Sequence, residues 1–206
     1  STTGCVSSSR IPVVATINPL PSNDLVAVNG SICSTGTVNI SVTGAALGTT
    51  VDWYADATGG VVLAGGTGSI SYITPILNTN TITTYYAEVR NSTTGCISST
   101  RIPVIARVDS LPIINLGNDT AICADQNITF NAGAGYPNYL WSTGATTSTI
   151  NVNTANEYRV TVTDGNGCIG RDTINLAIDS LPIINLGNDT AICADQNITF
   201  NAGAGY

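Results

Sequence analysis

A long exact repeat constrains this chain more than any other feature. Residues 109–136 recur without a change as residues 179–206, at an offset of 70 residues. A second repeat relates residues 1–17 to residues 92–108, which agree at 12 of 17 positions. Repeats of this size indicate a tandem array, in which each unit duplicates one folding pattern or part of it.

The repeats predict four segments. We expect the C-terminal strand of a preceding domain at 1–18, a complete domain at 19–108, a second complete domain at 109–178, and the N-terminal part of a further repeat at 179–206. The joints between these segments are short and contain prolines, which favours stiff connections. On this interpretation the chain is a window from a longer array.

The composition excludes several classes of function. The chain has no histidine and no lysine, which excludes a serine–histidine–aspartate triad, an imidazole zinc site and a lysine Schiff base. Its net charge of -7 argues against a nucleic-acid partner, and no apolar run suggests membrane insertion. The only glutamates, Glu88 and Glu157, lie in alternating stretches where a solvated face is expected. We therefore expect neither an enzyme nor a bound cofactor.

Apolar residues alternate with polar ones along most of the chain, as in residues 37–43. This period of two predicts half-buried strands, and turn signals every 8 to 12 residues predict all-β sandwiches. Trp53 and Trp141 lie where the third strand of an immunoglobulin-like sandwich places its core tryptophan. Tyr86 and Tyr158 lie in the late strand that would face it. We expect all four side chains in the cores.

Six cysteines in a chain of this composition indicate an oxidising, extracellular setting. The repeats make Cys5 equivalent to Cys96, and Cys193 equivalent to Cys123. Six independent thiols remain an alternative, whereas the absence of a CxxC pair disfavours a metal cluster. The predicted disulfides are Cys33–Cys96 and Cys123–Cys168, with Cys5 and Cys193 paired to residues outside the window.

Three aspartates could supply oxygen ligands to calcium. Asp119, Asp125 and Asp164 lie in loops that might share one end of a sandwich, and calcium takes six to eight oxygens. Turn chemistry explains the same residues, because Asp-Gly-Asn-Gly at 164–167 is a typical tight turn. Both interpretations stay open on the sequence alone.

Several motifs are similar to those of a known group of proteins. LPIINLGNDTAIC at 111–123 and YLWSTGATTSTINVNTANEYRVTVTDGNGC at 139–168 resemble the PKD-like and Ig-like repeats of giant surface adhesins of Bacteroidota. YYAEVRNSTTGCISSTRIPVIARV at 85–108 resembles the last two strands of a second repeat type in these proteins, of which the gliding-motility adhesins are the best known. The resemblance implies tandem immunoglobulin-like (PKD-like) β-sandwiches in an elongated array. It also implies type IX secretion and a location at the cell surface or outside the cell.

Asp-Ser/Thr-aliphatic triplets occur five times and resemble the O-glycosylation acceptor motif of Bacteroidota. Chance occurrence in threonine-rich strands is the alternative. The candidate hydroxyl residues are Ser110, Thr120, Thr173, Ser180 and Thr190.

These observations predict a non-enzymatic stalk segment of a large extracellular adhesin or filament, which displays a distal binding region. The expected partners are neighbouring repeats of the same chain, while the distal ligand, a glycan or a cell surface, is unknown. One alternative is a homo-oligomeric filament assembled by strand-swapped or laterally packed repeats. Another is that the repeats themselves bind glycans, with Tyr54, Tyr136 and Tyr139 as candidate aromatic contacts.

Overall fold

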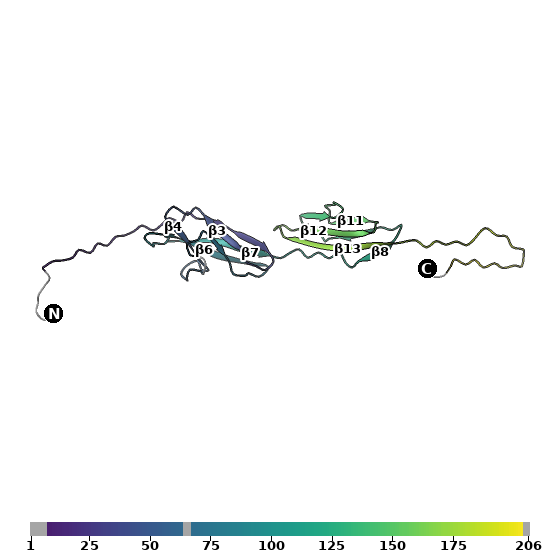
Figure 1. The fold of residues 1–206 in the computed structure, drawn as a ribbon, viewed down its shortest axis with the longest axis horizontal. Coiled ribbons are helices and arrows are strands. Elements are labelled where there is room, and N and C mark those ends of the chain that lie inside the picture. Colours follow the sequence, from purple (N-terminus) through teal and green to yellow (C-terminus); the bar gives the residue numbers. More distant parts are fainter. Residues whose placement is uncertain (1–7, 64–66, 204–206) are drawn as a thin grey trace, which may run out of the picture. The chain divides into compact units, whose positions relative to one another are not determined.

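The computed structural model describes residues 8–63 and 67–203, which contain thirteen β-strands and no helix (Figure 1). They divide into two compact units between Ser110 and Leu111. None of the described residues forms a helix long and apolar enough to cross a lipid bilayer.

The first unit consists of two packed sheets. The three-stranded antiparallel sheet has the order β1-β3-β5, and the four-stranded sheet has the order β2-β7-β6-β4. In the larger sheet β2 runs parallel to β7, while the other neighbours are antiparallel. The strands are β1 (Val26–Val28), β2 (Gly30–Cys33), β3 (Asn39–Thr43), β4 (Thr49–Tyr54), β5 (Ser71–Ile73), β6 (Thr81–Asn91) and β7 (Ile102–Asp109).

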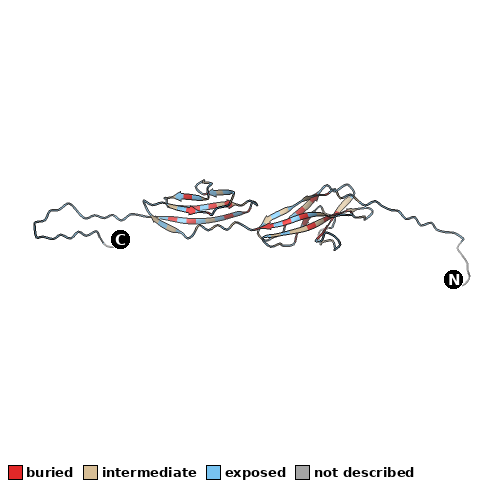
Figure 2. Cartoon of the chain, turned by 180° about the vertical axis from the view of Figure 1, so that it is seen from behind, coloured by how far each residue is buried: buried red, intermediate tan, exposed pale blue. Residues whose placement is uncertain are grey.

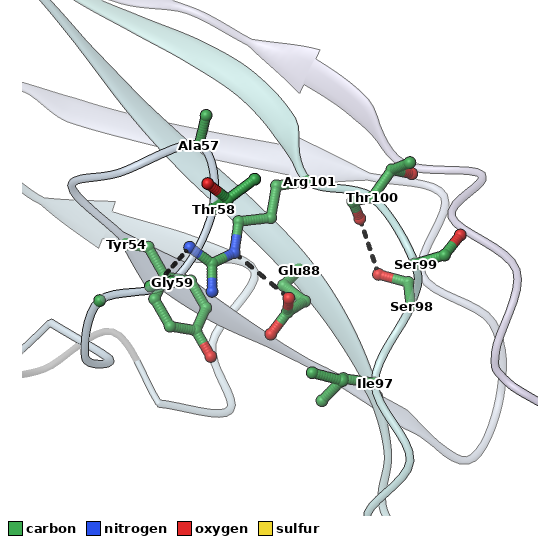
Figure 3. A pocket seen from close by; sticks show the side chains of 11 residues that line it. Tyr54, Ala57, Thr58, Gly59, Glu88, Ile97, Ser98, Ser99, Thr100 and Arg101 are labelled. Atoms are coloured by element: carbon green, nitrogen blue, oxygen red, sulfur yellow. Dashed lines mark hydrogen bonds and ion pairs between the residues drawn. The ribbon is translucent and has the colours of Figure 1, made fainter.

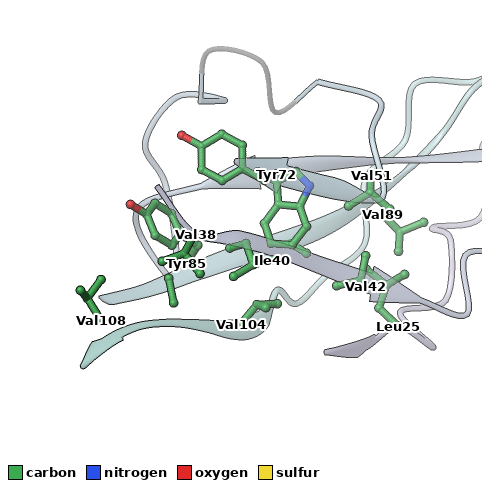
Figure 4. Close-up of a cluster of buried hydrophobic side chains, with 13 residues drawn as sticks. Leu25, Val38, Ile40, Val42, Val51, Tyr72, Tyr85, Val89, Val104 and Val108 are labelled. Atoms are coloured by element: carbon green, nitrogen blue, oxygen red, sulfur yellow. The ribbon is translucent and has the colours of Figure 1, made fainter. Parts of the chain in front are cut away.

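The core of the first unit lies between these sheets, and buried residues alternate with exposed ones along the strands (Figures 2 and 4). Trp53 is fully buried at its centre, as predicted, and its ring stacks on Tyr72 at 5.9 Å. The indole nitrogen Nε1 donates to the backbone oxygen of Ser69 at 2.8 Å, so the buried polar atom is satisfied.

The tyrosine partner of Trp53 was predicted one residue too late. Tyr85 is buried against Tyr72, whereas Tyr86 lies on the opposite face of β6 and is half-buried. The prediction of Tyr86 as a core residue is therefore wrong. Successive side chains of a strand point to opposite faces, so an error of one position moves the residue from the core to the outer face.

The second unit repeats this plan with shorter strands. Its four-stranded sheet has the order β10-β12-β13-β8, with β8 parallel to β13, and a two-stranded sheet pairs β9 with β11. The strands are β8 (Thr120–Cys123), β9 (Ile128–Asn131), β10 (Asn138–Trp141), β11 (Thr149–Val152), β12 (Asn156–Thr163) and β13 (Ile169–Asp179).

Trp141 and Tyr158 are in the core of the second unit, as predicted. The indole of Trp141 donates to the backbone oxygen of Thr147 at 2.8 Å. The Tyr158 hydroxyl donates to the backbone oxygen of Thr154 at 2.8 Å, four residues upstream. A late-strand tyrosine that bonds back to the preceding backbone is typical of immunoglobulin-like sandwiches.

Gly30 lies where the chain passes from one sheet of the first unit to the other. A Cβ at this position would lie 2.2 Å from the backbone oxygen of Asn39. Gly170, at the start of β13, has an equivalent constraint, because its Cβ would lie 2.4 Å from the backbone oxygen of Pro112. Both glycines therefore permit close approach of two backbone segments.

The predicted pairing of Cys33 with Cys96 is wrong. Cys33 is disulfide-bonded, but Cys96 is a free thiol. Cys33 lies beside Asp109 at the end of β7, whereas Cys96 lies beside Asn91 at the end of β6. The antiparallel β6 separates these positions by roughly 33 Å at about 3.3 Å per residue, far beyond the 7 Å between Cα atoms that a disulfide spans.

The predicted pairing of Cys123 with Cys168 is wrong for the same reason. Cys168 is disulfide-bonded and buried, whereas Cys123 is a free, exposed thiol. Cys123 pairs with Asp179 at the end of β13, and Cys168 directly precedes its start. Cys193 is a free, exposed thiol, and Cys5 lies outside the described residues.

Two described segments, residues 8–25 and 180–203, form no strand. The second has the sequence of residues 110–133, which contribute β8 and β9 to the second unit. Phe130 is 3% exposed in that unit, whereas its counterpart Phe200 is 55% exposed. One sequence therefore appears both packed and unpacked in this chain.

Candidate functional site

Two acidic residues face each other on the outer surface of the larger sheet in the first unit. Asp52 of β4 is the cross-strand partner of Glu88 of β6, and they are 1% and 5% exposed. Like charges directly opposite each other destabilise a sheet, and a buried carboxylate needs a partner. Each acid accordingly has its own arginine.

Arg90 pairs with Asp52, with 2.6 Å between Nε and Oδ2. The backbone nitrogen of Gly68 donates to the other carboxylate oxygen of Asp52 at 3.2 Å. Arg101 pairs with Glu88, with 3.2 Å between Nε and Oε1, and both of these side chains are more than nine-tenths buried. The second pair is therefore the more shielded of the two.

Arg101 also ties the loop after β4 to the sheet (Figure 3). Its Nη1 donates to the backbone oxygens of Asp56 and Gly59 at 2.8 and 2.7 Å. Its guanidinium carbon lies 3.3 Å from the centroid of the Tyr54 ring, a close cation–π contact. One arginine thus connects a buried carboxylate, an aromatic ring and a loop.

These groups form one side of a pocket of about 640 Å³. Volumes between about 300 and 1,000 Å³ are usual for small-molecule sites. The loop after β4 and the turn before β7 supply the rest of its wall. The lining residues are Tyr54, Ala57, Thr58, Gly59, Gly60, Glu88, Ile97, Ser98, Ser99, Thr100 and Arg101.

One carboxylate oxygen in the pocket wall has no hydrogen-bond partner among the described residues. Glu88 Oε2 is buried and unpaired, although Oε1 accepts from Arg101. Burying a polar atom without a partner costs about 1–3 kcal/mol, and more for a charged group. By contrast, the buried hydroxyl of Ser98 is satisfied, because it accepts from the Val89 nitrogen and donates to the Thr100 oxygen.

Burial raises the pKa of the Tyr54 phenol, and the nearby Glu88 carboxylate raises it further. The phenol is therefore neutral at physiological pH and can donate a hydrogen bond. Burial likewise raises the pKa of Tyr72 and of Tyr85 in the same unit. The pocket thus combines a neutral phenol with an ion pair whose charges cancel.

The sequence did not predict this cluster. Glu88 was expected on a solvated face, and it does lie on the outer face of its sheet, but the adjoining loops bury it. Glu157 is exposed, with Arg159 as its partner at 2.6 Å. The repeat held a signal, because Ser98, Ser99 and Arg101 have identical counterparts at residues 7, 8 and 10.

The three predicted calcium ligands do not form one site. Asp119 accepts from the backbone nitrogen and the side-chain amide of Asn175, both at 2.9 Å, in the middle of β13. Asp164 caps the turn that precedes β13 by accepting from the backbone nitrogens of Asn166 and Cys168. Asp125 follows β8, beyond the far end of β13. In the described part of the chain, no three metal-ligating side chains gather.

Asn175 lowers the pKa of Asp119, because its backbone and side-chain donors stabilise the carboxylate. The carboxylate therefore pins the entry to β8 against β13. This is a structural role that the turn interpretation of the sequence comes closest to describing.

The five candidate glycosylation residues remain predictions. Four of their side chains are exposed, and the fifth, Thr120, is half-buried at the start of β8. Of the candidate aromatic contacts, Tyr54 is 5% exposed beneath Arg101. Tyr136 and Tyr139 pack edge to face in the other unit, and the Tyr139 hydroxyl donates to the backbone oxygen of Gly133.

Comparison with known proteins agrees with this architecture. Residues 21–109 match the model of a family described as Ig-like domain CHU_C associated. The first unit is an immunoglobulin-like repeat. The predicted all-β, immunoglobulin-like fold is therefore confirmed. No curated protein matches the sequence.

Solved structures of similar fold are distant in sequence. Fibronectin(III)-like modules of Clostridium thermocellum CbhA are 12% identical, with a TM-score of 0.42, and the match covers 81% of this chain and all of theirs. Murine CEACAM1b is also 12% identical, with a TM-score of 0.40 and coverage of 76% and 100%. Likenesses at this level carry no argument about function.

Proposed function

We propose that this chain is a non-enzymatic structural segment of a large extracellular bacterial adhesin or surface filament, in which it serves as a stalk for a distal binding region. The observation that carries the proposal is that each unit has a separate hydrophobic core of its own. A module that buries its own core can be added or removed in number without disturbing its neighbours, as a stalk of adjustable length requires.

The repeats support the same proposal. A segment of 28 residues recurs without change, which suits duplication for length, since a specific site needs only one copy. The match of the first unit to an Ig-like repeat family, and not to a catalytic one, is consistent with this role. Secretion by the type IX system and a location outside the cell belong to the proposal.

Replacement within the parent protein tests the stalk role. Residues 19–178 are exchanged for two unrelated immunoglobulin-like domains, or deleted, and attachment of the producing cells to a surface is counted. A stalk predicts that deletion reduces attachment and that the unrelated domains restore it. If only the native sequence restores attachment, the repeats bind the surface themselves and the stalk proposal fails.

A multi-chain filament is the second candidate. It rests on residues 180–203, whose apolar side chains are exposed although the same sequence is packed in the second unit. Such a segment could complete a sandwich in another chain. Native mass measurement of the intact chain over a range of concentrations decides it, because a constant monomer excludes strand exchange.

A further inference from the structure

The pocket beside Glu88 contains a feature that the fold does not require. Glu88 is 5% exposed and its Oε2 has no hydrogen-bond partner among the described residues. The atom belongs to the wall of a pocket, so a bound molecule can reach it (Figure 3). A buried acceptor of this kind calls for a donor, O–H or N–H.

The charges around Oε2 select against ions. The guanidinium of Arg101, 3.2 Å from the other oxygen of Glu88, balances the carboxylate and repels an ammonium group or a metal cation. Calcium would also need six to eight oxygens, and this pocket offers one free carboxylate oxygen. An anion fares no better, because Nε and Nη1 of Arg101 are already engaged and Glu88 repels it. The remaining class is a neutral hydroxyl donor.

The rim favours a molecule with several hydroxyls and an apolar face. The exposed hydroxyls of Thr58, Ser99 and Thr100 line the pocket, and each can donate or accept. Ala57 and Ile97 add apolar contact, and both are exposed. A pyranose ring combines hydroxyls around its edge with C–H groups on its faces, and it therefore matches this lining.

We propose that this pocket binds a neutral sugar unit, with Glu88 Oε2 accepting a hydrogen bond from one sugar hydroxyl. Identical residues stand at the positions of Ser98, Ser99 and Arg101 in the first repeat, so the rim is duplicated along with the strand that follows it. The site goes beyond the stalk role, since a stalk could hold weak sugar sites along its length.

The test uses the full chain labelled with ¹⁵N. Glucose, galactose, mannose and N-acetylglucosamine are titrated separately, with methylammonium, calcium and acetate as probes of the competing chemistries. We expect at least one sugar to shift the amide signals of residues 57–60 and 97–101 saturably, and the ionic probes to leave them unchanged. The proposal is overturned if no sugar shifts these signals, if the shifts lie elsewhere, or if an ionic probe replaces the sugar.

Two tryptophan variants separate binding in the pocket from binding elsewhere. Ser99→Trp places a large side chain at the rim without touching the ion pair, whereas Thr79→Trp adds the same group to an exposed turn outside the pocket lining. We expect Ser99→Trp to weaken sugar binding about tenfold or more and Thr79→Trp to leave it unchanged. Equal affinity in the two variants overturns the assignment.

Glu88→Gln adds a second check. It keeps the shape of the side chain but replaces a charged acceptor with an amide. We expect weaker sugar binding in this variant at a temperature where its far-ultraviolet spectrum is native. Undiminished binding by folded Glu88→Gln would show that the carboxylate is not the acceptor.

Discussion

Replacing Arg101 with methionine should destabilise the first unit severely. The side chains of Arg101 and Glu88 are 9% and 6% exposed, so the substitution leaves a carboxylate buried without its cation. Removing one partner of a buried pair costs about 3–5 kcal/mol. The substitution also removes the cation–π contact with Tyr54 and two hydrogen bonds to the loop after β4. These losses overlap with the first, so we expect the total to remain near 3–5 kcal/mol, a large share of the 5–15 kcal/mol typical of a domain.

Urea unfolding followed by Trp53 fluorescence measures this loss, in a Trp141→Phe background that removes the second unit's signal. The control is Arg159→Met, which breaks an ion pair whose side chains are 58% and 50% exposed. Such exposed pairs contribute about 0–1 kcal/mol. The double variant Glu88→Gln/Arg101→Met removes the buried charge as well, and it should recover much of the stability that Arg101→Met loses.

The pH dependence of the variant provides an independent check. Without Arg101, burial raises the pKa of Glu88 above its unfolded value, so the folded variant takes up a proton more readily than the unfolded one. Its stability should then rise relative to wild type as the pH falls from about 7 toward 5. A loss below about 1 kcal/mol at neutral pH, or a double variant no more stable than the single one, would refute the buried-pair reasoning.

Three further predictions concern other parts of the chain. Gly170→Ala should destabilise the second unit by about 1–3 kcal/mol, since its Cβ would lie 2.4 Å from the Pro112 oxygen, while Gly165→Ala, with nothing within 4 Å, should be nearly neutral in thermal unfolding. Alkylation without reduction, followed by peptide mass mapping, should label Cys96 and spare Cys33; the reverse pattern would contradict the observed thiol state. The first unit should lose stability above pH about 10, because its three buried phenols have raised pKa values and unfolding lets them ionise; constant stability up to pH 12 would contradict this.

The alternation of apolar residues predicted the sandwiches because burial between two sheets imposes a period of two directly. It did not determine the phase at Tyr85 and Tyr86, where two tyrosines follow each other. The phase was nevertheless recoverable from Val89, since counting back by twos gives Ala87 and Tyr85, and all three are buried. A β-branched residue away from the ambiguous pair was therefore the better guide.

The cluster around Glu88 was not predictable from the same pattern. Alternation assigns Glu88 to the outer face of its sheet, and that assignment is right. Whether the outer face is wet depends on the loop after β4 and the turn before β7, which fold back over it. Loop conformation has no period, and here it depends on Arg101 reaching the carbonyls of Asp56 and Gly59. A buried polar site built by loops on a sheet thus escapes a method based on strand periodicity.

The cysteine pairing failed for a different reason, because it relied on spacing and ignored strand direction. In each unit the first-strand cysteine lies on a short strand that runs parallel to the last strand, near that strand's end. The second cysteine lies in the turn that precedes the same last strand, near its start. A last strand of eight or eleven residues therefore holds the two sulfurs at opposite ends of the domain. Any sandwich with this parallel first strand excludes the intradomain bond, so each bonded cysteine must find its partner at its own end of the domain.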